Sequence, residues 1–402
     1  MLNGILNEEP PYAERHVRWC ERSVNTKIGD KHLRLVFTSY SIGMGRGGIS
    51  SFFFPYALYF QNYAYFCNCI NLTTMEKKFY PLLFEPILHE KVWGGHQLTK
   101  VKGLPDTTNP MGESWEVSAV PGSTSIISNG AAKGRDLISV IADAPKEILG
   151  GKVAEEYHDQ MPLLIKFIDA QDDLSIQVHP NDAMAQRLGY ERGKTEMWYV
   201  LDAKPGAYLY EGFTHDIDEA EFRRRIADGT ICDVLDKQTV KPGDAFFIPA
   251  GTVHAICSGL LIAEIQQSCD LTYRIFDYNR PGLDGKPREL HVDLAAEALN
   301  YKAGAQYRSQ YHYEQGKANT VVSSPYFTVR VDDVQGDTHF NLLDRDSFVI
   351  LMALEGDCRI RVTATGEEVM LRHGYSAMLP AAIAEYDLLP QSGSCKVIDA
   401  YL

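Results

Sequence analysis

Short apolar or alternating runs, separated by Gly, Pro, Asn and Asp residues, recur from about residue 75 to the end of the chain. Such runs are typical of β-sandwiches and barrels, in which each strand ends at a turn. The pattern predicts strands over residues 123–128, 163–168, 196–201, 207–210, 245–249 and 260–265. We therefore expect a mainly β protein.

Helical periodicity is rare in the same part of the chain. The clearest helix is predicted over residues 218–227, which carry acidic side chains in the first turn and basic ones later. Thr214 or Asp216 is its expected N-cap, and Gly229 is its expected end. Shorter helices are predicted over residues 137–142 and 293–299. We expect these few helices to flank the sheets.

Residues 1–74 differ from the rest of the chain. They hold seven basic and five acidic residues, whereas the whole chain has a net charge of -14. Residues 49–70 are uncharged and rich in aromatic side chains, but Pro55, Gln61 and Asn62 interrupt the run, which makes a membrane span a poor interpretation. We expect residues 1–74 to be an atypical N-terminal extension, outside the folded core and without a role in the chemistry.

A weak internal repeat indicates a duplicated architecture. Residues 241–254 resemble residues 371–385, and their alignment places His254 opposite Glu385. We predict two β-sandwich barrels of the jelly-roll kind with a small helical insertion. The predicted boundaries are residues 75–320 for the first barrel with the insertion and residues 321–402 for the second barrel.

Composition narrows the class of protein. The chain has 402 residues, of which 45% are hydrophobic and 23% charged, as in soluble globular proteins. Its negative charge argues against a nucleic-acid partner or an anionic membrane surface, because both require a basic patch. An anionic substrate would need a local cluster of Lys and Arg. The eight cysteines have irregular spacings, so we expect reduced thiols and a cytoplasmic protein.

Four polar residues have the character of metal ligands. Gln177 and His179 stand two apart in the apolar run 174–179, so on a strand both side chains point to one face. Glu196 and His254 could complete the set. Two imidazoles with two side-chain oxygens suit Zn²⁺ best, with Fe²⁺, Mn²⁺ or Co²⁺ as alternatives. An open position for substrate would make such a site catalytic.

Several segments of the chain resemble one family. They are residues 162–166, 174–180, 193–198, 240–254 and 270–278. Together they resemble the type I mannose-6-phosphate isomerases of the short bacterial kind, which belong to the cupin superfamily. The resemblance implies two cupin-like barrels, interconversion of mannose 6-phosphate and fructose 6-phosphate, and Arg274 facing the substrate. It also implies one Zn²⁺ per chain, held by Gln177, His179, Glu196 and His254, and a second barrel without metal.

Such a reaction moves a proton between adjacent carbons of an open-chain sugar phosphate through an enediolate. A divalent cation would stabilise the developing charge, and a nearby group must carry the proton. Lys166 is a candidate because it interrupts the apolar run 163–168, although a strand-edge lysine that reaches water is the alternative. Lys194 could bind phosphate or hydroxyls, or be a turn lysine after Gly193. Arg274 could stabilise the enediolate, clamp the phosphate, or form a surface ion pair.

Four more residues are candidates for the sugar pocket. Trp93, Glu113 and Glu116 lie in segments that resemble the family near its N-terminal strand, and Asp270 lies close to the proposed Arg274 in sequence. The alternative interpretation is that the glutamates pair with nearby Lys or Arg residues and that the neighbouring Trp115 belongs to the core.

Two rival functions remain open at this point. One is another metal-dependent cupin enzyme, such as an iron oxygenase, but Gln177 occupies a position where many oxygenases have a histidine. The other is a non-catalytic cupin that senses phosphosugars. Retention of Lys166, Lys194 and Arg274 beside the four ligands favours the isomerase. The physiological metal, the proton-transferring group, the preferred direction, the exact aldose and the oligomeric state stay open.

Overall fold

The computed structural model describes residues 23–28, 31–36, 79–105 and 107–402. The chain divides into two compact units, residues 1–76 and 77–402. In the first unit, the described residues form an antiparallel hairpin of β1 (Ser23–Ile28) and β2 (Lys31–Val36). The aromatic run at residues 49–70 and most of the predicted extension lie outside the described residues.

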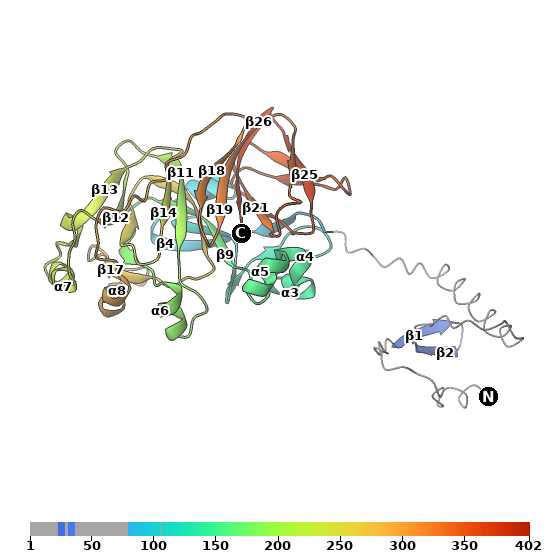
Figure 1. The fold of residues 1–402 in the computed structure, drawn as a ribbon, viewed down its shortest axis with the longest axis horizontal. Helices are drawn as coiled ribbons and strands as arrows, with labels where there is room; N and C mark the ends of the chain where they lie inside the picture. Colours follow the sequence, from blue (N-terminus) through green and yellow to red (C-terminus); the bar gives the residue numbers. More distant parts are fainter. Residues whose placement is uncertain (1–22, 29–30, 37–78, 106) are drawn as a thin grey trace, which may run out of the picture. The chain divides into compact units, whose positions relative to one another are not determined.

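The first barrel of the second unit is a sandwich of two antiparallel sheets (Figure 1). The six-stranded sheet has the order β14 (Ala245–Ile248), β11 (Glu196–Ala203), β16 (Leu260–Gln267), β9 (Leu163–Ala170), β4 (Ile87–Gly95), β5 (Met111–Val117). The five-stranded sheet has the order β13 (Leu235–Thr239), β12 (Tyr208–Phe213), β15 (His254–Ile256), β10 (Ile176–Val178), β17 (Tyr273–Phe276). Apolar side chains such as Leu209, Trp198 and Phe246 fill the space between them.

The second barrel also has two antiparallel sheets. The seven-stranded sheet has the order β18 (Ala318–Ser323), β19 (Thr328–Gln335), β26 (Ser394–Tyr401), β21 (Val349–Glu355), β24 (Ser376–Leu379), β3 (Leu82–Glu85), β8 (Ile126–Ile127). The four-stranded sheet has the order β20 (Thr338–Asn341), β25 (Glu385–Pro390), β22 (Cys358–Val362), β23 (Glu368–Leu371). The prediction of a mainly β protein with two barrels is confirmed.

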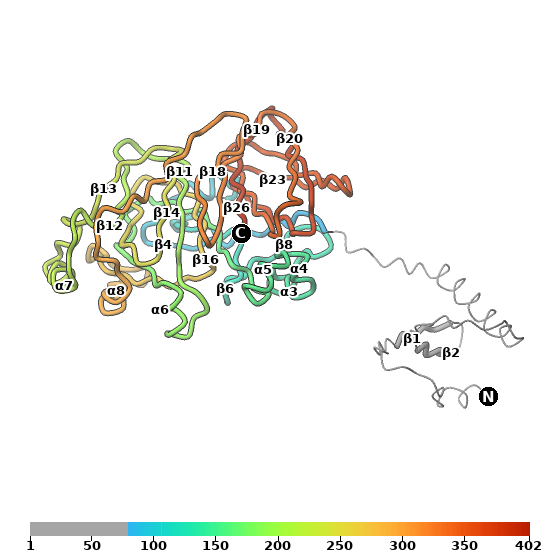
Figure 2. Tube along the Cα trace, in the orientation of Figure 1, coloured from blue at the N-terminus to red at the C-terminus, as the bar shows by residue number. Residues whose placement is uncertain are grey.

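Two strands from the beginning of the second unit complete the sheet of the second barrel. Leu83 of β3 pairs with Ala377 of β24, and β8 continues the sheet beyond β3. The trace in Figure 2 follows this crossing from the early strands to the C-terminal barrel. A boundary at residue 320 therefore does not separate the strands of the two barrels.

The two barrels share a core. Ile165 of β9 and Ile265 of β16 belong to the same buried cluster as Val329 of β19 and Ile398 of β26. All eight residues of β9 are buried, because one face of this strand points into the first barrel and the other toward the second. Such burial on both faces explains why the sequence of β9 is a nearly continuous apolar run, in which a lysine is conspicuous.

Helices cover the outside of the sheets. A cluster of α3 (Leu137–Asp143), α4 (Pro145–Leu149) and α5 (Gly151–Glu156) joins β8 to β9. The other α-helices of the described residues are α2 (Gln97–Val101), α6 (Asp182–Arg187), α7 (Glu219–Ala227) and α8 (Val292–Ala298). The three predicted helices are present, but the N-cap of α7 is Asp218, whose side chain accepts a hydrogen bond from Glu221 N, and not Thr214 or Asp216. Among the described helices, none combines the length and apolar character needed to traverse a lipid bilayer.

The remaining differences from the predicted strands are small. The predicted strand at residues 123–128 is split into β7 (Ser123–Thr124), which pairs with β6 (Ala119–Val120), and β8. Ser125 lies between the two pieces, and its hydroxyl accepts a hydrogen bond from Ser118 N. The backbone of Ser125 also bonds outside the named strands: its N–H donates to Ser118 O, and its carbonyl accepts from Leu137 N.

Candidate metal centre and substrate pocket

The four predicted metal ligands converge inside the first barrel. Gln177 of β10 lies directly opposite His254 of β15, His179 directly follows β10, and Glu196 begins β11. One ligand atom each from His179, Glu196 and His254 lie within 4.8 Å of one another, and all three residues are buried. The amide Nε2 of Gln177 lies 3.2 Å from Nε2 of His254, which places this side chain beside the other three.

Backbone carbonyls orient both imidazole rings. Nδ1 of His179 lies 2.9 Å from Leu271 O, and Nδ1 of His254 lies 2.9 Å from Thr252 O. Because a carbonyl can only accept, each Nδ1 carries the proton and each Nε2 keeps a lone pair. The Nε2 atoms lie 3.4 and 3.3 Å from the two carboxylate oxygens of Glu196. Histidines that bind metals are oriented by carbonyls in this manner.

Electrostatics keep the group in the protonation states that metal binding needs. Burial lowers the pKa of His179 to about 3 and also lowers the pKa of His254, so both rings are neutral. Burial alone would raise the pKa of Glu196, but Lys194 and the two imidazoles outweigh it and hold that pKa well below its usual range. Neutral imidazoles and an ionised carboxylate are the ligand forms of Zn²⁺.

Lys194 reaches the same cluster from the residue two before Glu196. Its Nζ lies 2.9 Å from Glu196 Oε2 and 3.0 Å from His179 Nε2. Lys194 lies in the loop after Gly193, as the alternative had it, but its side chain is only 5% exposed and points into the protein. Both Glu196 oxygens are buried and accept no well-formed hydrogen bond from the described residues. A buried carboxylate with unused lone pairs, two imidazoles and an amide fit a divalent cation.

The second barrel repeats the layout without the ligands. Asn341 pairs with Glu385 between β20 and β25, as Gln177 pairs with His254 between β10 and β15. Val349 begins β21 in the place that Glu196 has in β11. An exposed amide and carboxylate that bond each other at 3.0 Å, beside a valine, do not form a comparable ligand set.

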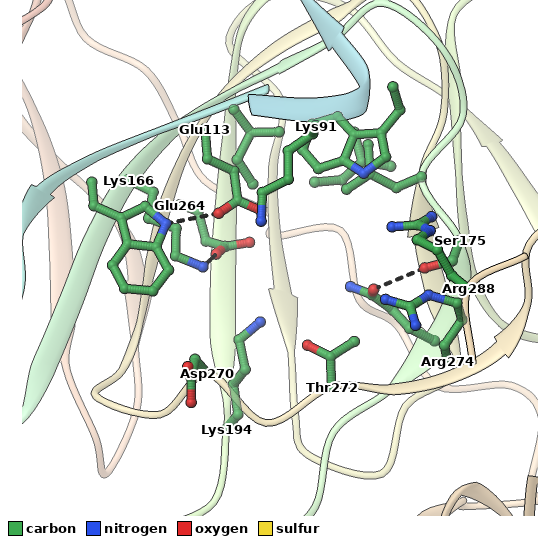
Figure 3. Close-up of a pocket in the computed structure, with 16 residues that line it drawn as sticks. Lys91, Glu113, Lys166, Ser175, Lys194, Glu264, Asp270, Thr272, Arg274 and Arg288 are labelled. Atoms are coloured by element: carbon green, nitrogen blue, oxygen red, sulfur yellow. Dashed lines mark hydrogen bonds and ion pairs between the residues drawn. The ribbon is translucent and has the colours of Figure 1, made fainter. Parts of the chain in front are cut away.

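A pocket of about 320 Å³ adjoins the ligand cluster (Figure 3). It contains five cations and three carboxylates, although the chain as a whole is acidic. This is the local basic cluster that an anionic substrate requires. The charged and polar residues of its lining are Lys91, Glu113, Lys166, Ser175, Gln177, Lys194, Glu264, Asp270, Thr272, Arg274 and Arg288.

One side of the pocket carries an acid–base pair. Lys166 Nζ lies 3.1 Å from Glu264 Oε1, and the side chains are 7% and 4% exposed. Trp198 Nε1 donates a hydrogen bond of 3.1 Å to Glu264 Oε2, and Lys166 lies over the ring of Trp115. Burial raises the pKa of Glu264, an effect that Lys166 opposes. Because β9 is an interior strand, the alternative of an edge lysine that reaches water is wrong.

Two arginines line the opposite side, as Figure 3 shows. Arg274 lies opposite Gln177 in the β10–β17 pair and donates a hydrogen bond of 2.8 Å to Glu289 O. It forms no ion pair with a carboxylate of the described residues, and its Nε is buried without a partner. Arg288 is held by two bonds of 2.6 Å to the carboxylate of Asp277. Burial lowers the pKa of Arg274, as does the neighbouring Arg288.

The other predicted pocket residues are divided between two places. Trp93, Glu113 and Asp270 line the pocket. Glu116 does not line it, because it lies on the opposite face of β5 and binds Lys102 at 2.7 Å. The predicted place of Glu116 in the sugar pocket is therefore wrong. Its pairing with a lysine is the alternative that the sequence left open.

Sequence reasoning missed three charged residues of the pocket. Glu264 had a signal, because it interrupts the apolar run 260–265 in the same way that Lys166 interrupts residues 163–168. No pattern in the sequence marked Arg288, since it lies in a loop between β17 and α8. Lys91 is two residues before Trp93 on β4, so strand alternation places both on one face.

Comparisons with known proteins agree with this site. The model of the type I phosphomannose isomerase catalytic domain matches residues 82–209, and that of the mannose-6-phosphate isomerase cupin domain matches residues 317–402. The mannose-6-phosphate isomerase of Streptococcus mutans is 37% identical over 307 residues, which cover 76% of this chain and 94% of that protein. The probable mannose-6-phosphate isomerase GmuF of Bacillus subtilis is 36% identical and covers 79% of this chain and 98% of its own length.

Solved structures give the same result. The crystal structure of mannose 6-phosphate isomerase from Bacillus subtilis has 32% sequence identity and a TM-score of 0.72, and the match covers 80% of this chain and 99% of that one. The relatives therefore match over nearly their whole length. With the two barrels and the clustered ligands, these similarities establish that the chain belongs to the type I mannose-6-phosphate isomerase family.

Proposed function

We propose that this protein interconverts mannose 6-phosphate and fructose 6-phosphate. The observation that carries the proposal is the position of the His179, Glu196 and His254 cluster beside a pocket that has an acid–base pair on one side and two arginines on the other. A metal site alone would suit many cupin enzymes. The cationic pocket adds the means to bind a phosphate, and the acid–base pair adds the means to move a proton.

We propose Zn²⁺ as the metal, one per chain, held by Gln177, His179, Glu196 and His254. When bound, a divalent cation supplies Lewis-acid stabilisation of negative charge on the sugar oxygens. Lys194 contributes a second positive charge at the same place and donates hydrogen bonds to a substrate oxygen. Its ammonium is buried next to Glu196, so water competes weakly for it.

Glu264 and Lys166 are our candidates for proton transfer. Isomerisation takes a proton from one carbon of the open-chain sugar and returns it to the neighbouring carbon, so one group must alternate between base and acid. Burial moves the pKa of Glu264 toward neutrality, as this task requires. Lys166 forms an ion pair with one of its oxygens and Trp198 donates a hydrogen bond to the other, and together they fix the direction of the carboxyl group.

The arginine side is our candidate for phosphate binding. Arg274 and Arg288 offer planar donor groups that match phosphate oxygens, and Ser175 and Thr272 lie on the same part of the lining. Glu113 and Asp270 would accept hydrogen bonds from sugar hydroxyls, and Trp93 would cover the sugar ring. A cytoplasmic location is part of the proposal, because the five cysteines in the described residues are free thiols.

A coupled assay with mannose 6-phosphate tests the proposal directly. We expect turnover by the zinc-loaded protein, its loss on chelation, and its recovery with Zn²⁺. His254→Ala should lose metal and activity together, and Glu264→Gln should keep metal but lose at least about 100-fold in kcat. His312→Ala, which changes an exposed histidine, is the matched control. Full turnover after complete metal removal would contradict the metal role. Binding of mannose 6-phosphate without turnover would favour the phosphosugar sensor.

A further inference from the structure

A buried polar network joins the second barrel to a strand that forms one wall of the pocket. Lys102, directly after α2, places Nζ 2.7 Å from Glu116 Oε1 of β5, and the side chains are only 1% and 2% exposed. The same ammonium donates to Gly374 O, in the turn before β24, and lies 4.6 Å from the centroid of the Tyr375 ring. In return, the Tyr375 hydroxyl donates to Lys102 O at 2.9 Å.

The network lies directly behind the substrate pocket. Ser114 and Glu116 occupy the face of β5 that meets the second barrel, and Ser376 of β24 lies 3.5 Å from Glu116 Oε2. Glu113 and Trp115 occupy the other face and line the pocket. Because successive residues of a strand alternate between faces, the pocket residues Glu113 and Trp115 are adjacent in sequence to Ser114 and Glu116, which bond each other in this network.

The buried contact between Lys102, Glu116 and the second barrel is polar, whereas apolar side chains join the barrels elsewhere. Ile165, Val329 and Met378 belong to an apolar core that joins the barrels elsewhere. A buried ion pair contributes little net stability compared with apolar residues of similar volume, but its directional bonds fix one arrangement of the groups it joins. Lys102 makes such bonds to both barrels at once.

We propose that Lys102 and Glu116 are positioning residues, through which the second, metal-free barrel sets the place of Glu113 and Trp115 in the pocket. Glu113 accepts a hydrogen bond of 2.7 Å from Trp115 Nε1 and lies 3.3 Å from Lys91 Nζ. Trp115 in turn lies under Lys166, at 5.0 Å from its Nζ to the ring centroid. A shift of β5 would therefore move substrate-binding groups and the wall beside the acid–base pair.

Steady-state kinetics with a double-mutant cycle test the inference, whose kinetic part rests on the proposed function. Lys102→Met should raise KM for mannose 6-phosphate about tenfold and change kcat less than about threefold. In a Glu113→Gln background, the same substitution should change KM less than about twofold, because Glu113 is the substrate-binding group among the two residues that the network positions. An unchanged KM in Lys102→Met, or an equal increase in both backgrounds, would overturn the proposal.

Two further variants separate positioning from loss of stability. Arg330→Met removes the Arg330–Asp399 ion pair inside the second barrel, which does not involve β5, and should lower the unfolding temperature while leaving KM within about twofold of wild type. Glu116→Gln keeps the shape of the side chain. It should raise KM in the same direction as Lys102→Met if that variant does not fold.

A spectroscopic readout keeps the test independent of turnover. In protein labelled with 5-fluorotryptophan, the Trp115 resonance is assigned by its absence in Trp115→Phe. It should shift in Lys102→Met and Glu116→Gln but not in Arg330→Met. An unshifted Trp115 signal in both network variants would refute the positioning role even if the wild type had no isomerase activity. Absence of turnover with the expected shifts would refute only the proposed function.

Discussion

Replacement of Lys166 by Met is expected to destabilise the protein to a degree that depends on pH. In the wild type, its ammonium lies 3.1 Å from Glu264, and both side chains are almost fully buried. Without it, Glu264 keeps one neutral donor, Trp198 Nε1, but loses its ion-pair partner. Breaking a buried ion pair from one side costs about 3–5 kcal/mol while the remaining group stays charged.

The carboxyl group can escape part of this cost by taking up a proton. Burial already raises the pKa of Glu264, and loss of Lys166 raises it further above the ordinary value of 4.5. At pH values between the ordinary pKa of the unfolded chain and the raised pKa of Glu264 in the folded variant, the folded variant binds more protons than the unfolded chain. Its free energy of unfolding therefore falls as the pH rises through this range. We expect a loss of about 1 kcal/mol at pH 5 and about 3 kcal/mol at pH 8.

Urea unfolding of the metal-free protein at pH 5 and pH 8, followed by tryptophan fluorescence, measures the effect. The double variant Lys166→Met/Glu264→Gln removes both charges, so it should recover most of the stability at pH 8 and lose the pH dependence, while remaining inactive. Lys166→Arg keeps the charge and is the matched control. The reasoning is refuted if Lys166→Met loses the same stability at both pH values, or if the double variant is no more stable than the single one.

Three other predictions follow from the same geometry. Arg288→Ala should raise KM for mannose 6-phosphate by about 10-fold or more with little change in kcat, in steady-state assays, because a phosphate-binding group is lost; an unchanged KM would remove it from that role. The cations Lys166 and Lys91 outweigh burial and lower the pKa of Glu113 to about 2, so its stabilising effect is present above the ordinary pKa of 4.5 and is lost as pH falls toward 2. In Glu113→Gln, the free energy of unfolding should therefore decrease less than in the wild type as the pH is lowered toward 2. An equal decrease in both proteins would contradict this. In Gly193→Ala the new Cβ would lie 2.5 Å from Pro180 O, so the segment before Glu196 must shift. In a competition experiment with a chelator, the variant should bind zinc about 10–100-fold more weakly than the wild type. An unchanged zinc affinity would contradict this prediction.

Local sequence patterns were sufficient to predict several of the strands and to single out the candidate metal ligands. Gln177 and His179 could be assigned to one face because a strand has a period of two residues. Glu196 and His254 each stand at the beginning of a strand, in segments whose order along the chain resembles the family. The barrel brings the side chains together: ligand atoms of His179, Glu196 and His254 lie within 4.8 Å of one another, and Gln177 Nε2 lies 3.2 Å from His254 Nε2.

Residues whose place depends on distant contacts were harder to predict. Glu113 and Glu116 were assigned together, but they are three apart on a strand, so alternation puts them on opposite faces. That signal was available in the sequence. Arg288 reaches the pocket from a loop, and its position depends on Asp277, which no periodic pattern marks. The predicted N-caps of α7, Asp216 and Thr214, lie two and four residues before the observed one, an error of the kind common at helix ends.

The pairing of β3 with β24 has a consequence for how the protein is made. Leu83 leaves the ribosome roughly 290 residues before its partner Ala377, a separation that places this contact among the slowest kind to form. During synthesis the apolar β3 is an unpaired strand edge, which can recruit other chains. Truncation near the C-terminus therefore removes not only a terminal barrel but also the partner of a strand close to the start of the folded unit, and such fragments are expected to aggregate.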